Sequence, residues 1–364
     1  MNQLLTLAAN AIQFIDSTGQ LKHPLPASVN ESLLLEFYRT MVLIRQFDKK
    51  AVALQRTGQL GTYPSCMGQE AFSTGIGFAL KSDDVFVPYY RDQATKYLRG
   101  VKLHQILQLW GGDERGNLYE GAAIQDLPDC VPIATQITHA AGIATAMKIR
   151  GEHRAVVATC GEGATSRGDF YESINLAGVW HLPLVVVVNN NQWAISVPRR
   201  LQTGAETFAD KATSAGIKGV QVDGNDVAAV YQATQHALNR ARQGKGGTLI
   251  EAVTYRLGDH TTADDASRYR SAAELNQAWE LEPIKRLQAY LHNNALWNPE
   301  KELALQAESK AAVEKAVDTY LGLAPQAPNE MFEYLFEELP YSMHSQKEQF
   351  IQKANSMGGQ RHGH

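Results

Sequence analysis

Two short runs of β-branched and aliphatic residues constrain the fold of this chain more than any other feature. Residues 155–160 (AVVATC) and 184–189 (LVVVVN) are almost continuously apolar, without the alternation of a strand that has one face in water. Such runs are typical of parallel strands that helices cover on both faces. Residues 220–223 and 248–254 show a weaker form of the same pattern. The sequence therefore predicts several buried, parallel strands.

Segments with helical spacing alternate with these runs. Apolar residues recur at helical spacing over 227–241, with Asp226 near the start and Gly244 after the end. Residues 136–150 are rich in alanine and have the same period. Strands that alternate with helices form βαβ units. We therefore predict an α/β fold, a parallel β-sheet flanked by helices.

The two ends of the 364-residue chain differ from its middle. Residues 1–30 contain turn signals and prolines and predict an N-terminal arm. Residues 31–325 hold the alternating pattern and predict one α/β domain. The C-terminal part is helical in pattern and ends in the polar stretch SMGGQRHGH. We therefore predict a helical C-terminal extension and flexible tail over 326–364.

The composition excludes several classes of partner and location. The chain is 44% apolar and 20% charged with a net charge of −4, which predicts a globular protein with no nucleic-acid and no membrane partner. Its longest aliphatic run, 184–188, is far shorter than the ~20 residues of a membrane span. Three widely spaced cysteines and the absence of a signal pattern predict a reducing compartment. We expect the cytoplasm, or the mitochondrial matrix for a processed eukaryotic chain.

Residues 159–196 carry the strongest functional signal. A predicted strand ends at Cys160 and is followed by Gly161, Glu162, Gly163 and Ala164, and the next strand ends in a run of three asparagines, 189–191. Open α/β sheets bind ligands at this carboxyl edge. Glycines allow a phosphate to approach the backbone, and carboxylate and amide oxygens suit Mg²⁺. The pattern predicts a magnesium–diphosphate site.

Two other interpretations compete for the same residues. Gly161-x-Gly163 after a strand also occurs in nicotinamide-dinucleotide sites. Ser166 stands where that motif needs a third glycine, and asparagines stand where it needs a ribose-binding acid, so we disfavour it. The other alternative is a tight turn and an asparagine-rich loop that bind no ligand, and the spacing of the asparagine cluster argues against it.

A family resemblance sharpens this interpretation. Gly161-Glu162-Gly163, followed after 26 residues by paired asparagines at 190 and 191, resembles the thiamine-diphosphate signature. The alpha subunit of the first, decarboxylating component of 2-oxo acid dehydrogenase complexes is resembled by residues 61–71, 87–92, 131–136, 163–179, 189–198, 221–231 and 254–270. The similarity covers about residues 10–340 and implies the thiamine-diphosphate-binding fold. Glu162 stands where most of the wider family has aspartate, although branched-chain alpha subunits of animals also carry glutamate there.

The resemblance implies roles for particular residues. The side chains of Glu162 and Asn191 and the backbone carbonyl of Trp193 would bind Mg²⁺. His260, in the loop LGDHTTADDASRYR, corresponds to an active-site histidine beside the cofactor and the incoming lipoyl group; alone, it would be read as a solvated or capping residue. Tyr63 and Gln69 are candidate contacts of the pocket. The residues expected to contact the cofactor are Tyr90, Arg91, Val131, Ile133, Gly161, Gly163, Ala164, Asn189 and His260.

Two of these assignments have structural alternatives. Arg91 would grip the diphosphate with its planar guanidinium, but it could instead form an ion pair with Asp92. The second concerns a segment that holds a potassium ion in branched-chain relatives, where a cysteine replaces a hydroxyl ligand here. Its alternative is a helix start that Thr135 helps to cap. The segment's residues are Cys130, Pro132, Thr135 and Gln136.

The resemblance also implies an activity and its partners. The chain would use thiamine diphosphate and Mg²⁺ to decarboxylate a small 2-oxo acid and transfer the acyl group to the lipoyl arm of a dihydrolipoamide acyltransferase. A beta subunit in an α2β2 heterotetramer would supply the glutamate that activates the cofactor ring. Pyruvate is slightly favoured, and a branched-chain acid such as 3-methyl-2-oxobutanoate is the alternative. A non-catalytic scaffold is disfavoured because the metal and diphosphate residues are present.

Overall fold

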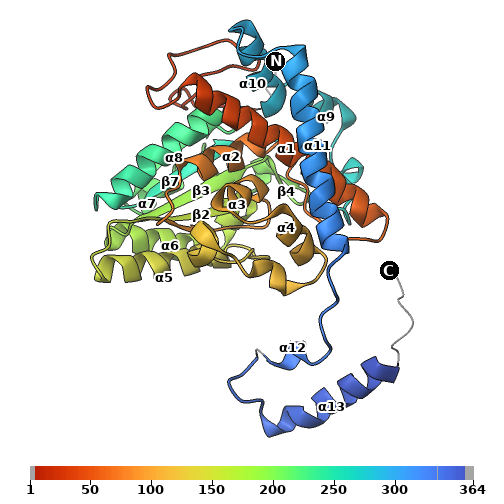
Figure 1. Ribbon diagram of the computed structural model, residues 1–364. Helices are drawn as coiled ribbons and strands as arrows, with labels where there is room; N and C mark the ends of the chain where they lie inside the picture. The colour runs from red at the N-terminus through yellow and green to blue at the C-terminus, as the bar shows by residue number, and fades with distance from the viewer. Residues whose placement is uncertain (1–4, 334, 357–364) are drawn as a thin grey trace.

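The centre of the molecule is a five-stranded sheet in which every neighbouring pair of strands is parallel. The computed structural model describes residues 5–333 and 335–356. The strand order is β1-β2-β3-β7-β6, and Figure 1 shows helices on both faces. The strands are β1 (Val85–Val87), β2 (Val156–Gly161), β3 (Leu184–Asn190), β6 (Lys218–Asp223) and β7 (Thr248–Val253). The predicted α/β class and its parallel sheet are confirmed.

The continuous apolar runs are explained by two separate cores, one on each face of the sheet. Along β3, Val185 and Val187 belong to one hydrophobic cluster, whereas Val186 and Val188 belong to the other. Because successive side chains point to opposite faces of a strand, burial on both faces requires an apolar residue at every position.

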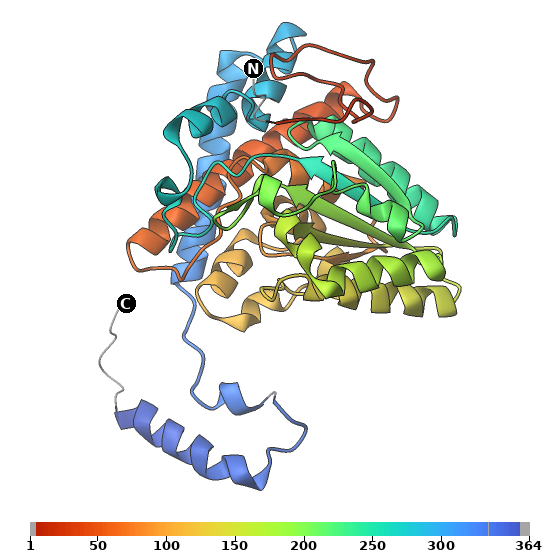
Figure 2. The same cartoon turned by 180° about the vertical axis from the view of Figure 1, so that it is seen from behind.

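Different sets of helices cover the two faces of the sheet. The first core lies under α1 (Glu31–Arg56), α2 (Glu70–Ala79) and α8 (Val227–Arg242), and the second under α5 (Thr135–Ile149) and α6 (Gly168–Val179). Figure 2 shows the same two layers from behind. The carboxylate of Asp226 caps α8 by accepting from the N–H groups of Ala228 and Ala229, as its position in the sequence predicts.

The remaining elements connect and extend these layers. The short pair β4 (Trp193–Ala194) and β5 (Val197–Pro198) is antiparallel and follows β3. The other α-helices are α3 (Gln93–Arg99), α4 (Leu103–Trp110), α7 (Lys211–Ser214), α9 (Ala272–Trp279), α10 (Pro283–Asn293), α11 (Pro299–Leu321), α12 (Glu330–Glu333) and α13 (Tyr341–Ser356). The 3-10 turns are Glu114–Asn117, Gly121–Gln125, Glu162–Ser166, Arg199–Leu201 and Ala266–Arg268.

The N-terminal segment runs along the outer strand of the sheet. Ile12 forms a parallel bridge with Val222 of β6, and the carboxylate of Asp226 accepts from the N–H groups of Phe14 and Ile15 at 2.6 and 2.8 Å. Phe14 and Ile15 are buried in the first core. The segment therefore contributes to the core as well as to the surface.

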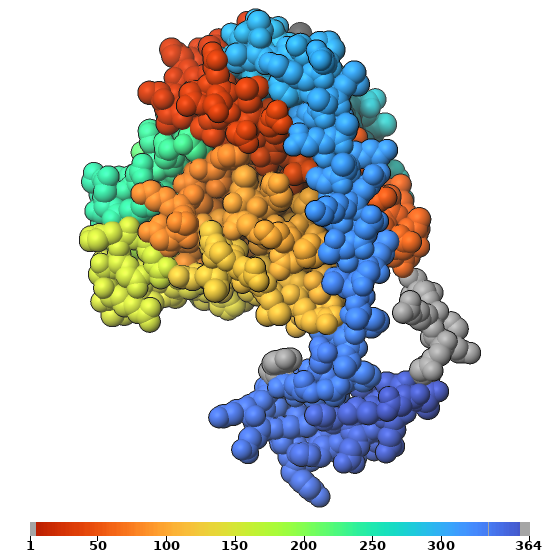
Figure 3. All heavy atoms as spheres, in the orientation of Figure 1, coloured from red at the N-terminus to blue at the C-terminus, as the bar shows by residue number. Residues whose placement is uncertain are grey.

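The C-terminal segment leaves the body after α11. In Figure 3 the described residues beyond α11, drawn in the darker blue, reach away from the rest of the molecule. Leu335, Phe336 and Tyr341 are exposed, and Phe332 packs against Phe350 with ring centroids 6.0 Å apart. The domain limits at 30 and 325 remain predictions, and the tail over 357–364 lies outside the described residues. None of the described helices has the length and apolar character needed to cross a bilayer.

Candidate functional site

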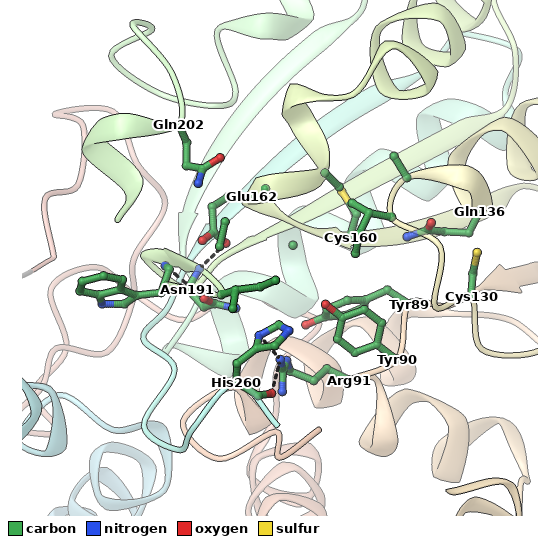
Figure 4. Close-up of a pocket in the computed structure, with 18 residues that line it drawn as sticks. Tyr89, Tyr90, Arg91, Cys130, Gln136, Cys160, Glu162, Asn191, Gln202 and His260 are labelled. Carbon is green, nitrogen blue, oxygen red and sulfur yellow. Dashed lines mark hydrogen bonds between the residues drawn. The ribbon is translucent and has the colours of Figure 1, made fainter. Parts of the chain in front are cut away.

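A cavity of about 190 Å³ opens at the carboxyl edge of β2 and β3. Figure 4 shows side chains from several segments pointing into it. Most of the predicted site residues meet there, namely Tyr90, Arg91, Cys130, Ile133, Gln136, Gly161, Glu162, Gly163, Ala164, Asn191, Trp193 and His260. The structure does not bring Val131, Pro132, Thr135 or Asn189 into the lining.

Glu162 is the acidic centre of this cavity. Its side chain lies on the first turn after β2, and the residue is only 1% exposed. Oε2 accepts a hydrogen bond from the N–H of Asn191 at 3.2 Å, whereas Oε1 has no hydrogen-bond partner. Burial raises the pKa of this carboxyl to about 7, and the backbone N–H donors only partly oppose the shift. A cation at Oε1 would provide the missing partner.

The two glycines beside Glu162 serve different purposes. A Cβ on Gly161 would meet no atom within 4 Å, so a ligand can approach the backbone there. A Cβ on Gly163 would lie 2.8 Å from the Cβ of Ala194, so this glycine is needed for the close approach of β4. Open space beside Gly161 is the arrangement that a phosphate cradle requires.

The three asparagines at the end of β3 do not act alike. Asn189 and Asn191 both donate through Nδ2 to Oε1 of Gln69, at 2.9 and 3.1 Å. Asn190 instead donates to Glu251 at 2.7 Å. This alternation follows from the two-residue period of a strand. Asn191 therefore borders the cavity, while Asn189 is fully buried behind it.

Trp193 lines the cavity, and its main chain and its side chain are hydrogen-bonded to different elements. Its N–H donates to Oδ1 of Asn191 at 3.3 Å, and its carbonyl accepts from Nη1 of Arg256 at 3.1 Å. The indole N–H donates to Glu274, 3.1 Å away. The side chain is thus tied to α9, away from the carbonyl that was predicted to bind the metal.

Arg91 is held by main-chain oxygens. It is 2% exposed and donates to the carbonyls of Ser65 and His260 at 2.7 and 2.8 Å. Asp92, its alternative partner, instead accepts hydrogen bonds from the N–H of Tyr89 and the hydroxyl of Thr159. The alternative ion pair between these neighbours is therefore not formed, and the guanidinium of Arg91 lies at the cavity wall.

His260 has a defined protonation state in this setting. Its Nδ1 lies 3.0 Å from Nη2 of Arg91 and 3.2 Å from Nη1 of Arg256. Guanidinium nitrogens only donate, so Nδ1 must accept and the proton of the neutral ring must sit on Nε2. Burial, with the charges of Arg91 and Arg256, lowers the pKa of His260 to about 3. The ring is therefore neutral at physiological pH and carries one N–H donor.

Comparison with known proteins decides the family. Residues 38–327 match the family described as "Dehydrogenase E1 component". The chain belongs to this family. The resemblance inferred from the sequence is thereby confirmed, and the family depends on thiamine diphosphate.

Named relatives cover nearly the whole chain. A protein of Staphylococcus aureus named pyruvate dehydrogenase E1 component subunit alpha is 38% identical over 94% of this chain and 93% of its own length. A protein of the same name from Acholeplasma laidlawii is 41% identical over 87% of this chain and 92% of its own. A protein of Mycobacterium tuberculosis named 3-methyl-2-oxobutanoate dehydrogenase subunit alpha is 38% identical over 95% of both chains. Both substrate interpretations thus occur among the relatives.

The segment compared with a potassium site in E1 relatives has one free acceptor. Oε1 of Gln136 is buried without a hydrogen-bond partner, while its Nε2 donates to the carbonyl of Thr159 at 2.8 Å. The thiol of Cys130 donates to the carbonyl of Pro132 at 3.3 Å. Helix α5 begins at Thr135, but the preceding Ala134 occupies the cap position with a φ of 71° and makes no side-chain cap. The capping role suggested for Thr135 is therefore wrong.

Sequence reasoning missed Arg256 and the contacts of Gln69. Arg256 is fully buried and also donates to the carbonyl of Ile195 at 2.7 Å and to the hydroxyl of Tyr269 at 2.8 Å. It lies inside the 254–270 segment that carries the E1 resemblance, which was the available signal. Tyr63, named as a pocket contact, is instead buried against Asp48. Residues that line the cavity without having been predicted are Tyr89, Ala134, Cys160, Ala194, Ile195 and Gln202.

Proposed function

We propose that this chain is the alpha subunit of a 2-oxo acid dehydrogenase that decarboxylates a small 2-oxo acid and passes the acyl group to the lipoyl arm of an acyltransferase. One observation carries the proposal: Oε1 of Glu162 is buried without a partner beside Asn191, in the cavity of an E1 family member. A cation would stabilise a buried carboxylate in this state. Mg²⁺ bound together with a diphosphate meets that requirement.

Each side chain of the cavity has a proposed task. Glu162, Asn191 and the carbonyl of Trp193 would hold Mg²⁺, with Arg256 releasing or sharing that carbonyl. The backbone at Gly161, Gly163 and Ala164 would cradle the diphosphate. The fixed guanidinium of Arg91 would bind its oxygens, which Arg does well because its donors are planar and preset. Tyr90, whose ring lies 5.3 Å from that guanidinium, completes this wall.

The bound cofactor supplies the electron sink that the loss of carbon dioxide needs, and the chain supplies position and proton control. His260 would present its Nε2–H to the reacting group, since Nδ1 is occupied by Arg91 and Arg256. A neutral imidazole can donate a hydrogen bond through this N–H without adding charge to the site. Because burial and the two arginines hold the pKa of His260 at about 3, we expect this state across the working pH range.

A beta subunit would complete the site. Among the described residues that line the cavity, Glu162 provides the single carboxylate, and the metal would occupy it. We infer that the second carboxylate, which activates the cofactor ring in relatives, comes from another chain. Ile133 and Ile195 at the cavity are 44% and 55% exposed, so they offer apolar surface to such a partner. An α2β2 heterotetramer would provide two such sites.

The substrate is proposed to be pyruvate, with a branched-chain acid as the second candidate. The names of the relatives support both, at 38% to 41% identity. Discrimination between a methyl and an isopropyl group is worth only about 1–3 kcal/mol in a pocket.

The test uses this chain copurified with its beta subunit, thiamine diphosphate and Mg²⁺. Reduction of an artificial electron acceptor would be followed with pyruvate, 3-methyl-2-oxobutanoate and 4-methyl-2-oxopentanoate in parallel. We expect turnover that requires both chains and prefers pyruvate. Preference for a branched acid would favour the second candidate, and no turnover with bound cofactor would contradict the proposal.

A further inference from the structure

Gln69 lies directly behind the proposed metal site and joins two of its asparagines. It is 1% exposed and does not line the cavity. Its single oxygen, Oε1, accepts from Nδ2 of Asn189 and from Nδ2 of Asn191, 120 and 122 residues further along the chain. One side-chain oxygen therefore connects the start of α2 to two positions at the end of β3.

The direction of these hydrogen bonds is fixed by a main-chain donor. The N–H of Trp193 can only donate, so the Asn191 atom that faces it at 3.3 Å must be Oδ1. Nδ2 of Asn191 then faces Gln69, whose atom there must be an oxygen. The same oxygen accepts from Asn189, which also donates to the hydroxyl of Tyr89 at 2.8 Å. The three amides therefore have one consistent orientation.

The main chain of Gln69 is held at the start of α2. Its N–H donates to the carbonyl of Cys66 at 2.9 Å, and its own carbonyl accepts from the N–H of Ser73 in the first turn of α2. The next residue, Glu70, is fully buried in an ion pair with Arg45. The main chain thus fixes where this side chain starts. The amide itself meets the two asparagines through Oε1, while its Nε2 is buried without a hydrogen-bond partner.

We propose that Gln69 is a positioning residue that fixes the amide of Asn191 so that its oxygen, and not its nitrogen, is available to the metal. This inference rests on the proposed function, because it takes Asn191 as a metal ligand. The two ends of an amide have nearly the same shape, but only the oxygen can bind Mg²⁺. By accepting from Nδ2, Gln69 disfavours the flipped amide. Partners behind a metal ligand commonly change metal affinity by about 10–100-fold when removed.

The experiment measures Mg²⁺ affinity in the complete complex with the beta subunit, by calorimetric titration in saturating thiamine diphosphate. Gln69→Leu keeps the size of the side chain but removes the acceptor. We expect it to weaken Mg²⁺ binding about tenfold. Gln69→Glu keeps an oxygen at the same place and should retain affinity within about twofold of the wild type. The thermal midpoint of the metal-free complex verifies that each variant is folded.

Two further variants separate orientation from general packing. Asn191→Asp replaces the amide with a carboxylate whose oxygens are equivalent, so a flip has no consequence. Adding Gln69→Leu to this variant should leave its Mg²⁺ affinity unchanged. Gln93→Leu is the matched control, since Gln93 is another fully buried amide, and it donates to the hydroxyl of Tyr63 and the carbonyl of Pro64, away from the asparagines.

The outcomes distinguish this inference from the proposed function. Tenfold weakening by Gln69→Leu that disappears in the Asn191→Asp background supports the positioning role. Equal weakening in both backgrounds, or wild-type affinity in Gln69→Leu, overturns it while leaving the metal site in place. A wild-type complex that binds thiamine diphosphate without Mg²⁺ contradicts the proposed function itself, and the inference with it.

Discussion

The carboxyl ends of β3 and β6 lie at the same edge of the sheet, with β7 between them. The carboxylates at these two ends differ in their hydrogen-bond partners. At the β6 end, Asp223 accepts from Gln13 at 2.6 Å and from Arg286 at 2.5 Å, and Asp226 accepts from the N–H groups of Phe14 and Ile15. At the β3 end, Oε1 of the neighbouring Glu162 has no partner. We call the β6 end, with Asp223 and Asp226, the closed end, and the β3 end, with Glu162 and Asn191, the open end.

The difference lies in what the chain itself brings to each end. The N-terminal segment passes over the closed end and supplies donors to its carboxylates. The open end receives one main-chain donor at Glu162 and otherwise faces a cavity. Parallel sheets collect polar strand ends at one edge in any case. A binding site results where the chain leaves one of them incomplete.

The largest effect is expected from removing a proposed metal ligand at the open end. Glu162→Ala or Asn191→Ala should reduce Mg²⁺-dependent binding of thiamine diphosphate more than about a hundredfold, because each removes a ligand of the metal and not merely a partner of one. Asp226→Ala, at the closed end, is the control and should keep cofactor affinity within about twofold. The measurement is calorimetric titration of the complex. Normal affinity in either open-end variant would contradict the assignment.

The pH dependence of stability sharpens the comparison. The pKa of Glu162 is raised by burial from 4.5 to about 7, so between these values the folded chain keeps a proton that the unfolded chain releases. The carboxyl of Glu162 therefore lowers the free energy of unfolding as the pH rises from about 4.5 to 7, and this loss of stability is complete above pH 7. Glu162→Gln removes the charge, so the metal-free variant should be more stable than the wild type by about 3 kcal/mol at pH 8.

The extra stability of Glu162→Gln over the wild type should shrink towards zero as the pH falls below 5. Urea unfolding of the cofactor-free chain at pH 5 and pH 8 measures both points. A difference between the wild type and Glu162→Gln that does not change with pH would show that Glu162 keeps an ordinary pKa.

A smaller loss is expected when the closed end is broken. Asp226→Ala removes the acceptor for the N–H groups of Phe14 and Ile15 and the cap of α8. We expect the free energy of unfolding to fall by about 2 kcal/mol. The N-terminal segment should also become sensitive to limited proteolysis. Unchanged unfolding midpoint and proteolysis would mean that this segment does not stabilise the closed end.

The open end also holds a neutral imidazole. His260→Ala should slow acyl transfer to the lipoyl group about tenfold more than it slows decarboxylation, because the Nε2–H donor is proposed to serve the incoming group. Rapid-mixing measurements of the two half-reactions separate these steps. Equal slowing of both steps, or no slowing, would remove this role from His260.

The smallest expected effect concerns the free oxygen of Gln136 near the open end. Cys130→Ser restores the hydroxyl that potassium-binding relatives carry. We expect about a threefold rise in K⁺ affinity, because a hydroxyl oxygen is a better ligand for a hard cation than a thiol. Titration of thermal stability with K⁺, with Na⁺ as control, measures it. A response identical to that of the wild type would argue against a potassium site.

The sequence was informative where local chemistry dictates structure. Continuous apolar runs predicted β2 and β3 within one residue of their observed limits, and Asp226 marked the start of α8. The residues at the open end were found because they follow these strands directly. The capping role of Thr135 failed because the backbone at Ala134 adopts a left-handed conformation that no local pattern indicated.

Contacts between distant segments were beyond such reasoning. The contact of Gln69 with Asn191 spans 122 residues, and that of Arg91 with His260 spans 169. Asn189 was expected to face the cofactor, but Gln69, Tyr89 and Thr254 enclose its side chain behind the cavity. Such contacts depend on how the elements pack, which periodicity and capping do not specify.

The most direct test of the account is a crystal structure of the alpha–beta complex with thiamine diphosphate and Mn²⁺ in place of Mg²⁺, because Mn²⁺ gives an anomalous signal. The account predicts one metal peak in this chain, about 2.1 Å from oxygens of Glu162 and Asn191. It predicts none beside Asp223 and Asp226. Bound cofactor without a metal at Glu162, or a metal at the closed end, would contradict it.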